Sequence, residues 1–212
     1  MPGQINRGTE LGEILYNLAS NTSLKNYVEI GTWNGQGSTK CFLDGLTARD
    51  DDWLFASYEA DEKFYQQAIA YHSEILCEKA KIIHGTVIDI DDVMTRKELS
   101  DMNELTDEHS KWLEADLNNY NGCSNKLNEI EHMKHIDVLL LDGGEFSTLP
   151  AFKALQNRVT FLVLDDTKLM KNKKVIELVG SMWNWTLIKK SDQRNGFAVY
   201  GCSTNKPISL SG

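Results

Sequence analysis

Residues 27–38 read YVEIGTWNGQGS, and this stretch decides the fold that we expect for the whole chain. It opens with an apolar run of β-forming residues, as in a buried strand of a parallel sheet. Three glycines then come within seven residues, and a helical pattern resumes at Ser38. Glycine lets the backbone approach a ligand closely, and the free N–H groups at a helix start bind anionic groups. The stretch therefore predicts a strand, a ligand-binding turn and a helix.

The spacing of the glycines narrows the class of ligand. A dinucleotide fingerprint has G-x-G-x-x-G straight after the strand. Here the order is Gly31-x-x-x-Gly35-x-Gly37, with Glu29 two residues before the first glycine. This order resembles the first motif of class I S-adenosylmethionine-dependent methyltransferases, in which the loop amides suit the carboxylate of the cofactor and nearby acids suit its ammonium and sulfonium. The residues that the resemblance assigns to the cofactor are Glu29, Gly31, Thr32, Asn34, Gly35, Gly37 and Ser38. A strand, turn and helix with incidental glycines is the plain alternative.

The composition predicts one globular domain over residues 1–212, with enough apolar residues (41%) for a packed core. A net charge of −9 argues against a broad grip on nucleic acid, which needs clustered Lys and Arg. We expect no membrane segment, because no apolar run is long enough and residues 1–7 lack a signal core. The four cysteines are scattered without a metal-binding spacing, which indicates reduced thiols and a cytoplasmic location.

Strand and helix patterns alternate along the chain and predict an α/β fold: a doubly wound, mostly parallel, Rossmann-like sheet of seven strands. The last two strands form an antiparallel hairpin, which again resembles the methyltransferase fold. The expected strands are 26–30, 53–59, 81–86, 135–142, 160–168, 183–190 and 196–202.

Two residues at strand ends are candidates for the nucleoside part of a cofactor. Glu59 ends the second strand, on the edge where open α/β sheets bind ligands, and an acid there can accept hydrogen bonds from both ribose hydroxyls. Thr86 ends the third strand and, with Val87, could flank an adenine. A surface acid stabilised by a helix dipole is the plain interpretation of Glu59.

Residues 88–133 are too long for a simple connection and predict a helical cap insertion of about two helices over an acceptor pocket. Trp112 and Tyr120 are candidate wall residues of that pocket. They could equally pack the insertion onto the body of the domain.

Three acids follow two neighbouring strands: Asp142 after one, and Asp165 and Asp166 after the next. Parallel neighbours bring these ends to one edge, and close carboxylates need a proton or a cation. The pattern resembles the metal site of cation-dependent O-methyltransferases, both catechol-type and macrolide-sugar type, over nearly the whole chain except the insertion. The resemblance implies that the three acids bind Mg²⁺, that Asp142 also borders the cofactor, and that the metal holds the acceptor hydroxyls. The plain alternative is that these acids cap turns and contact solvent.

The general base is the point at which the chain departs from this family. Catechol-type enzymes have a lysine three residues after the first aspartate, whereas this chain has Glu145. A carboxylate can serve as a base when desolvation raises its pKa. Lys168, near the acid pair, is the other candidate, and His135 lies at the wrong end of its strand.

The leading hypothesis is a methyltransferase that methylates a hydroxyl of a small molecule, a sugar or a phenol, with S-adenosylmethionine and Mg²⁺. The alternatives are a metal-independent methyltransferase with another acceptor and a non-catalytic cofactor-binding module. The glycine spacing disfavours a nicotinamide enzyme. The sequence leaves the acceptor, a homo-oligomer and the pathway open.

Overall fold

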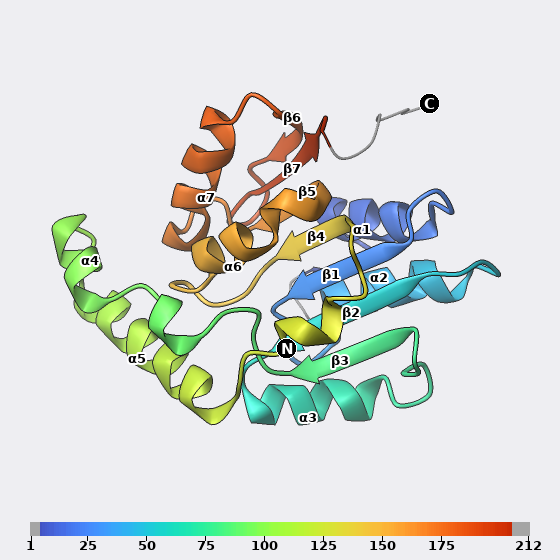
Figure 1. Ribbon diagram of the computed structural model, residues 1–212, viewed down its shortest axis with the longest axis horizontal. Helices are drawn as coiled ribbons and strands as arrows, with labels where there is room; N and C mark the ends of the chain where they lie inside the picture. Colours follow the sequence, from blue (N-terminus) through green and yellow to red (C-terminus); the bar gives the residue numbers. More distant parts are fainter. Residues whose placement is uncertain (1–4, 205–212) are drawn as a thin grey trace.

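The computed structural model describes residues 5–204 and contains one seven-stranded sheet in the order β3-β2-β1-β4-β5-β7-β6 (Figure 1). Strands β1 to β5 pair in parallel, and β7 runs antiparallel to both β5 and β6. The predicted Rossmann-like sheet with a closing hairpin is therefore confirmed. The strands are β1 (Asn26–Ile30), β2 (Leu54–Glu59), β3 (Ala80–His84), β4 (Ile136–Leu141), β5 (Val159–Asp165), β6 (Trp185–Ser191) and β7 (Phe197–Cys202).

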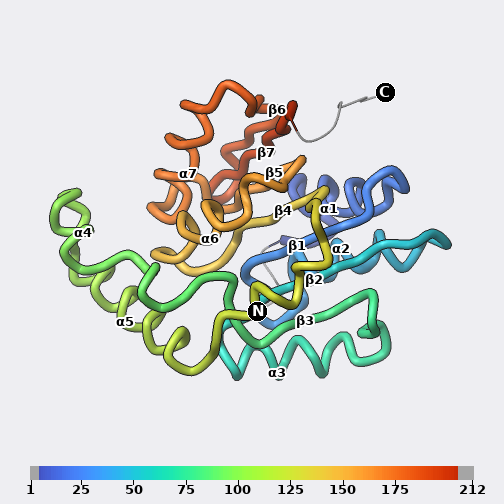
Figure 2. Tube along the Cα trace, in the orientation of Figure 1, coloured from blue at the N-terminus to red at the C-terminus, as the bar shows by residue number. Residues whose placement is uncertain are grey.

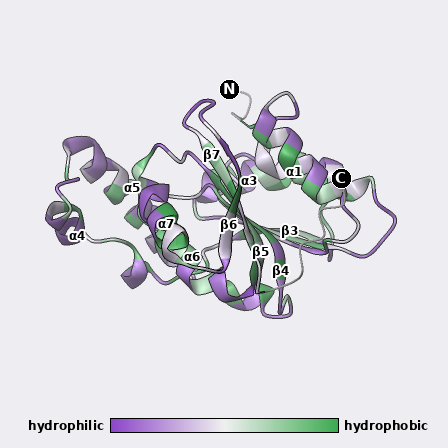
Figure 3. Cartoon of the chain, turned by 90° about the horizontal axis from the view of Figure 1, so that it is seen from above, coloured by the Kyte–Doolittle hydropathy of each residue, from purple (hydrophilic) through white to green (hydrophobic). Residues whose placement is uncertain are grey.

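Helices cover both faces of the sheet, and each face has its own hydrophobic core. Successive residues of a strand point to opposite faces, so Tyr27 of β1 packs toward α1 and α2 while Val28 packs toward α6 and α7. Figure 3 shows the apolar residues gathered along the strands between the two helical layers. The helices are α1 (Glu10–Ser20), α2 (Ser38–Thr47), α3 (Glu62–Tyr71), α6 (Thr148–Leu155) and α7 (Met170–Ser181), with a short 3₁₀ turn η3 (Gln156–Arg158) after α6.

The insertion between β3 and β4 contains two α-helices, α4 (Arg96–Asp101) and α5 (Asp107–Gly122). The 3₁₀ turns η1 (Ile90–Asp92) and η2 (Leu127–Ile130) flank them. Figure 2 shows the two helices standing beside the sheet, beyond the ends of the central strands. Leu99 of α4 and Leu113 of α5 are buried in the core that α6 and α7 also cover, and they hold the insertion in place.

Two further observations concern the cysteines and the question of membrane-spanning helices. The four cysteines are all free thiols. Over residues 5–204, no helix has the combination of length and hydrophobicity that crossing a bilayer requires.

Candidate active site

A cavity of about 370 Å³ lies at the carboxyl ends of the central strands. The strand order reverses between β1 and β4, and ligands of open α/β sheets bind at such a switch point. The cavity is lined by the loop after β1, the ends of β2, β4 and β5, and one side of α5. The lining residues that are polar or glycine are Gly31, Thr32, Gly37, Ser38, Tyr58, Glu59, Asp61, Gly85, Thr86, Asp116, Asn119, Tyr120, Asp142, Gly143, Gly144, Asp165, Asp166 and Arg194.

The glycine loop is wedged between the ends of β2 and β4. Gly31 has φ +101°, and its N–H donates a 2.9 Å hydrogen bond to the carbonyl of Tyr58 in β2. A Cβ at Gly31 would lie 2.4 Å from the carbonyl oxygen of Asp142. Only glycine combines this backbone conformation with such a close approach. The first glycine of the motif is therefore required by packing.

The start of α2 has free backbone N–H groups beside the cavity. Side chains of the N-cap residues cap the starts of α1, α3, α4 and α5, whereas α2, like α6 and α7, has no such cap. Gly37 and Ser38 both line the cavity. An uncapped helix start attracts an anion through its N–H groups and its dipole. The start of α2 is therefore a candidate site for an anionic group of a ligand.

Glu29 lies behind the loop and does not line the cavity. Its carboxylate is fully buried and accepts hydrogen bonds from the hydroxyls of Ser38 (2.5 Å), Thr39 (2.7 Å) and Ser57 (2.6 Å). Burial raises its pKa to about 7. The acid of the motif thus ties β1, β2 and the first turn of α2 together and positions the loop.

Two other motif residues also lie away from the cavity lining. Asn34 is buried, and its side-chain oxygen accepts a 3.1 Å hydrogen bond from the N–H of Gln36. Gly35 packs against α3, where a Cβ would meet His72 and Ala68. Both residues shape the turn.

Glu59 ends β2 on the cavity wall, as the sequence predicted. One carboxylate oxygen accepts a 2.6 Å hydrogen bond from the N–H of Trp33, and the other accepts one of 2.9 Å from the N–H of Asp61. Each oxygen keeps a second lone pair for a ligand hydroxyl. Burial raises the pKa of Glu59 to about 7. Thr86 also lines the cavity, with its hydroxyl donating to the carbonyl of Ile88 (2.7 Å).

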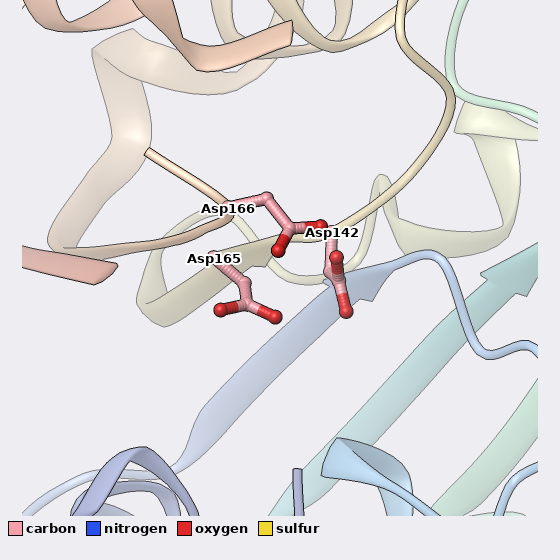
Figure 4. A group of neighbouring side chains, drawn as sticks. All are labelled: Asp142, Asp165 and Asp166. Atoms are coloured by element: carbon pink, nitrogen blue, oxygen red, sulfur yellow. The ribbon is translucent and has the colours of Figure 1, made fainter. Parts of the chain in front are cut away.

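Asp142, Asp165 and Asp166, here called the acidic cluster, lie together at the ends of β4 and β5 (Figure 4). One carboxylate oxygen from each lies within 4.8 Å of the others, a spacing that a metal ion could bridge. Burial, and then the nearby charge of Asp142, raises the pKa of Asp165 to about 7. Burial likewise raises the pKa of Asp142.

Two cations of the chain contact this cluster, and neither was predicted from the sequence. The Lys171 side chain is only 6% exposed, and its Nζ lies 2.8 Å from Asp142 Oδ1 and 3.0 Å from Asp166 Oδ2. Burial alone would lower the pKa of Lys171, but the two carboxylates outweigh it and raise that pKa above its usual value. Arg194, in the turn between β6 and β7, lies 3.5 Å from Asp165 Oδ2. Because the ammonium contacts two of the three carboxylates, the cluster in this arrangement does not fit a divalent ion. The Mg²⁺ site stays a prediction.

The two predicted bases lie outside the cavity lining. Glu145 accepts a 2.8 Å hydrogen bond from the backbone N–H of Lys171. Lys168 is half exposed, and its Nζ donates to the carbonyl of Asp192 (2.8 Å). The assignment of either residue as the base stays a prediction.

The insertion supplies an acid, Asp116, that was not predicted from the sequence. Asp116 of α5 lines the cavity and accepts a 3.2 Å hydrogen bond from the N–H of Phe146. A Cβ at Gly144 would lie 2.6 Å from the Asp116 carboxylate, so glycine permits this approach. Burial raises the pKa of Asp116 to about 6. Tyr120 lines the cavity too, whereas Trp112 packs against His109 away from it.

Three positions in the cavity wall have a left-handed backbone without being glycine. They are Trp33 (φ +51°), Asp166 (φ +54°) and Arg194 (φ +55°). Asn103, in the insertion, is the other such residue among those described. Left-handed residues other than glycine concentrate at functional sites, where the surrounding structure holds them. Their grouping marks this cavity as the functional part of the fold.

Comparisons with known proteins agree with this geometry at the level of the fold. No protein-family model matches the chain, and no curated protein matches its sequence. Three solved structures resemble it over most of their length. A candidate caffeoyl-CoA O-methyltransferase from Staphylococcus aureus is 14% identical, with a TM-score of 0.60 over 93% of this chain and 84% of that one. An O-methyltransferase from Bacillus cereus in complex with S-adenosylhomocysteine (SAH) is 12% identical, with a TM-score of 0.60 over 95% and 84%. The O-methyltransferase TomG from Streptomyces achromogenes, in complex with S-adenosylmethionine, is 12% identical, with a TM-score of 0.56 over 91% and 79%.

From its sheet order, its cavity and these matches, the chain has the fold of the class I S-adenosylmethionine-dependent methyltransferases, in the form seen in solved O-methyltransferases.

Proposed function

We propose that the protein transfers a methyl group from S-adenosylmethionine to a hydroxyl of a small molecule. The observation that carries the proposal is one cavity whose three walls present different chemical groups. The start of α2, which has no side-chain cap, lies on the first wall. Glu59, at the end of β2, lies on the second. Acids at the ends of β4 and β5 and on α5 form the third.

The first two walls suit the donor. When bound, S-adenosylmethionine supplies an electrophilic methyl group on its sulfonium. The N–H groups of Gly37 and Ser38 would hold the carboxylate, and Glu59 would accept hydrogen bonds from the ribose hydroxyls. The acidic surroundings would favour the positive charge of the donor. Positioning the two reactants supplies much of the catalysis in such a reaction.

The third wall suits an acceptor that carries hydroxyl groups. Asp116, Asn119 and Tyr120 present a carboxylate, an amide and a phenol from one side of α5. These groups can exchange hydrogen bonds with a sugar or a phenol. Asp116 is the base that we propose in place of Glu145 and Lys168, because it lines the cavity and its pKa of about 6 leaves it ionised at neutral pH. The solved O-methyltransferases of the same fold support an oxygen acceptor.

A metal requirement separates two versions of this proposal. A metal-dependent version would require Lys171 to leave the acidic cluster, whose oxygens are spaced for a shared ion and include Asp166 Oδ1, which is buried without a hydrogen-bond partner. The two Lys171 contacts favour a metal-independent reaction. Methyl transfer measured with and without EDTA distinguishes the two versions.

Calorimetric titration of the purified chain tests the proposal directly. We expect SAH to bind in a 1:1 complex and NAD to give no heat. Methyl transfer from labelled S-adenosylmethionine to a panel of sugars, phenols and amines then identifies the acceptor. Absence of affinity for both S-adenosylmethionine and SAH would overturn the proposal, and SAH binding without turnover on any acceptor would favour the non-catalytic module.

A further inference from the structure

The side chain of Lys171 in α7 contacts the acidic cluster. Lys171 is the second residue of α7, and its side chain is almost entirely buried. Its ammonium bridges two strand ends, with 2.8 Å to Asp142 Oδ1 after β4 and 3.0 Å to Asp166 Oδ2 after β5. The ammonium thus lies between two of the three carboxylates of the cluster, whose mutual repulsion it reduces.

The backbone at the start of α7 is held from both sides. The N–H of Lys171 donates to Glu145 Oε1 (2.8 Å), and the side-chain amide of Asn172 donates to the carbonyl of Asp165. These two hydrogen bonds fix the start of α7 beside the acidic cluster. Lys173 differs, because it is 56% exposed and pairs with Glu104 on the surface.

The chain itself supplies two cations for the three carboxylates of the cluster. Three carboxylates face Lys171 and Arg194, whose guanidinium lies 3.5 Å from Asp165 and 3.9 Å from Asp166. A divalent ion on the same oxygens would lie beside an ammonium in a poorly solvated site, where like charges repel strongly. An ion that took Asp142 Oδ1 or Asp166 Oδ2 would displace the lysine and leave it buried without that partner, which is costly.

We propose that the Lys171 ammonium takes the place of a divalent cation in the acidic cluster, so that the site carries its own counter-ion. The cluster geometry alone supports this charge compensation, and only its consequence, methyl transfer without metal, rests on the proposed function.

Metal titration of the full chain tests the inference without reference to activity. Mn²⁺ serves as the probe, because its binding is measured directly by electron paramagnetic resonance, and Mg²⁺ is followed by calorimetry. We expect the wild type and the matched control Lys173→Met to bind no stoichiometric Mn²⁺ at millimolar concentration. Lys171→Met should gain one site, and the further change Asp165→Asn should remove it.

Each result decides for or against the inference. A 1:1 Mn²⁺ site in the wild type that Asp165→Asn weakens would overturn it, and so would a folded Lys171→Met chain that binds no ion. Should Lys171→Met fail to fold, its circular dichroism is measured with added Mg²⁺: recovery of the folded signal supports the inference, and no recovery overturns it. SAH affinity of the wild type, measured separately, decides the proposed function and is independent of these titrations.

Discussion

At the scale of single residues, Glu59 is the most direct test of the cofactor site. Glu59→Gln replaces one acceptor oxygen with a donor that faces backbone N–H groups and removes the charge. A hydrogen bond to a charged group contributes about 1.5–3 kcal/mol, so SAH affinity should fall roughly 10- to 100-fold. Calorimetry measures the change. The matched control is Glu62→Gln, three residues on, where an exposed acid pairs with His84 outside the cavity and the affinity should stay unchanged. Wild-type affinity in Glu59→Gln would contradict the ribose role.

Asp116 tests the chemical step. Asp116→Asn keeps the size of the side chain and removes the base, so we expect kcat to fall by about 10²- to 10⁴-fold with little change in SAH affinity. The base must be ionised, so the wild-type rate should rise with pH through about 6 and then level off. The variant should lack this rise. A variant that keeps the wild-type rate and pH profile would assign Asp116 to acceptor binding alone.

The sequence could place the cavity-lining residues that follow strands, because the ends of apolar strands can be recognised in it. Glu59, Asp142 and Asp165 could be placed because each ends an apolar strand and parallel strands share one edge. Lys171 and Asp116 could not be placed, because each is a charged residue within a helix, where a solvent-exposed position is the ordinary expectation. Only the packing of α7 and α5 against the strand ends turns these side chains inward.

At the scale of elements, the loop between β1 and α2 depends on its first glycine. Gly31→Ala would place a Cβ 2.4 Å from the Asp142 carbonyl at φ +101°. We expect a loss of about 2 kcal/mol or more in the free energy of unfolding, together with loss of SAH binding. Urea unfolding and calorimetry measure the two effects.

Gly180, which lies within a helix, provides the control for the change at Gly31. Gly180 lies in α7 with nothing within 4 Å of its added Cβ. Gly180→Ala should leave SAH binding unchanged and stabilise the protein by up to about 1 kcal/mol, because alanine favours a helix more than glycine does. An equal loss of stability in both variants would show that Gly31 has no special role.

The strands could be predicted within a few residues, whereas the insertion could not be oriented. Buried parallel strands are apolar throughout and separated by clear turns, as β4 and β5 illustrate. The insertion has two helices as predicted, but α4 and α5 each bury only one residue fully. With so weak an apolar face, the sequence did not indicate that the Asp116 side of α5 would border the cavity.

At the scale of the whole molecule, buried acids should make stability depend on pH. Burial raises the pKa of Glu29 to about 7, from an unfolded value near 4.5. Between these values the folded state binds more protons, so the free energy of unfolding falls as pH rises through this range, by up to about 3 kcal/mol for this residue. Glu29→Gln should flatten the slope, because glutamine does not titrate and hydroxyls can still pair with it.

Urea titrations at a series of pH values from about 5 to 8 measure that slope. Glu62→Gln again serves as the control, since an exposed acid should leave the slope as in the wild type. Equal slopes in the Glu29→Gln variant and the wild type would mean that the pH dependence arises elsewhere, for example at Glu59 or Asp165, whose pKa values are also raised to about 7.

The lysine in the acidic cluster has a consequence for how the protein would work in a cell. A positive charge that is part of the polypeptide is present in every copy from the moment of folding, and no chelator or competing ion can remove it. The reaction rate would then not depend on the concentration of free magnesium. A substitution at the single position Lys171 would make the enzyme depend on that ion.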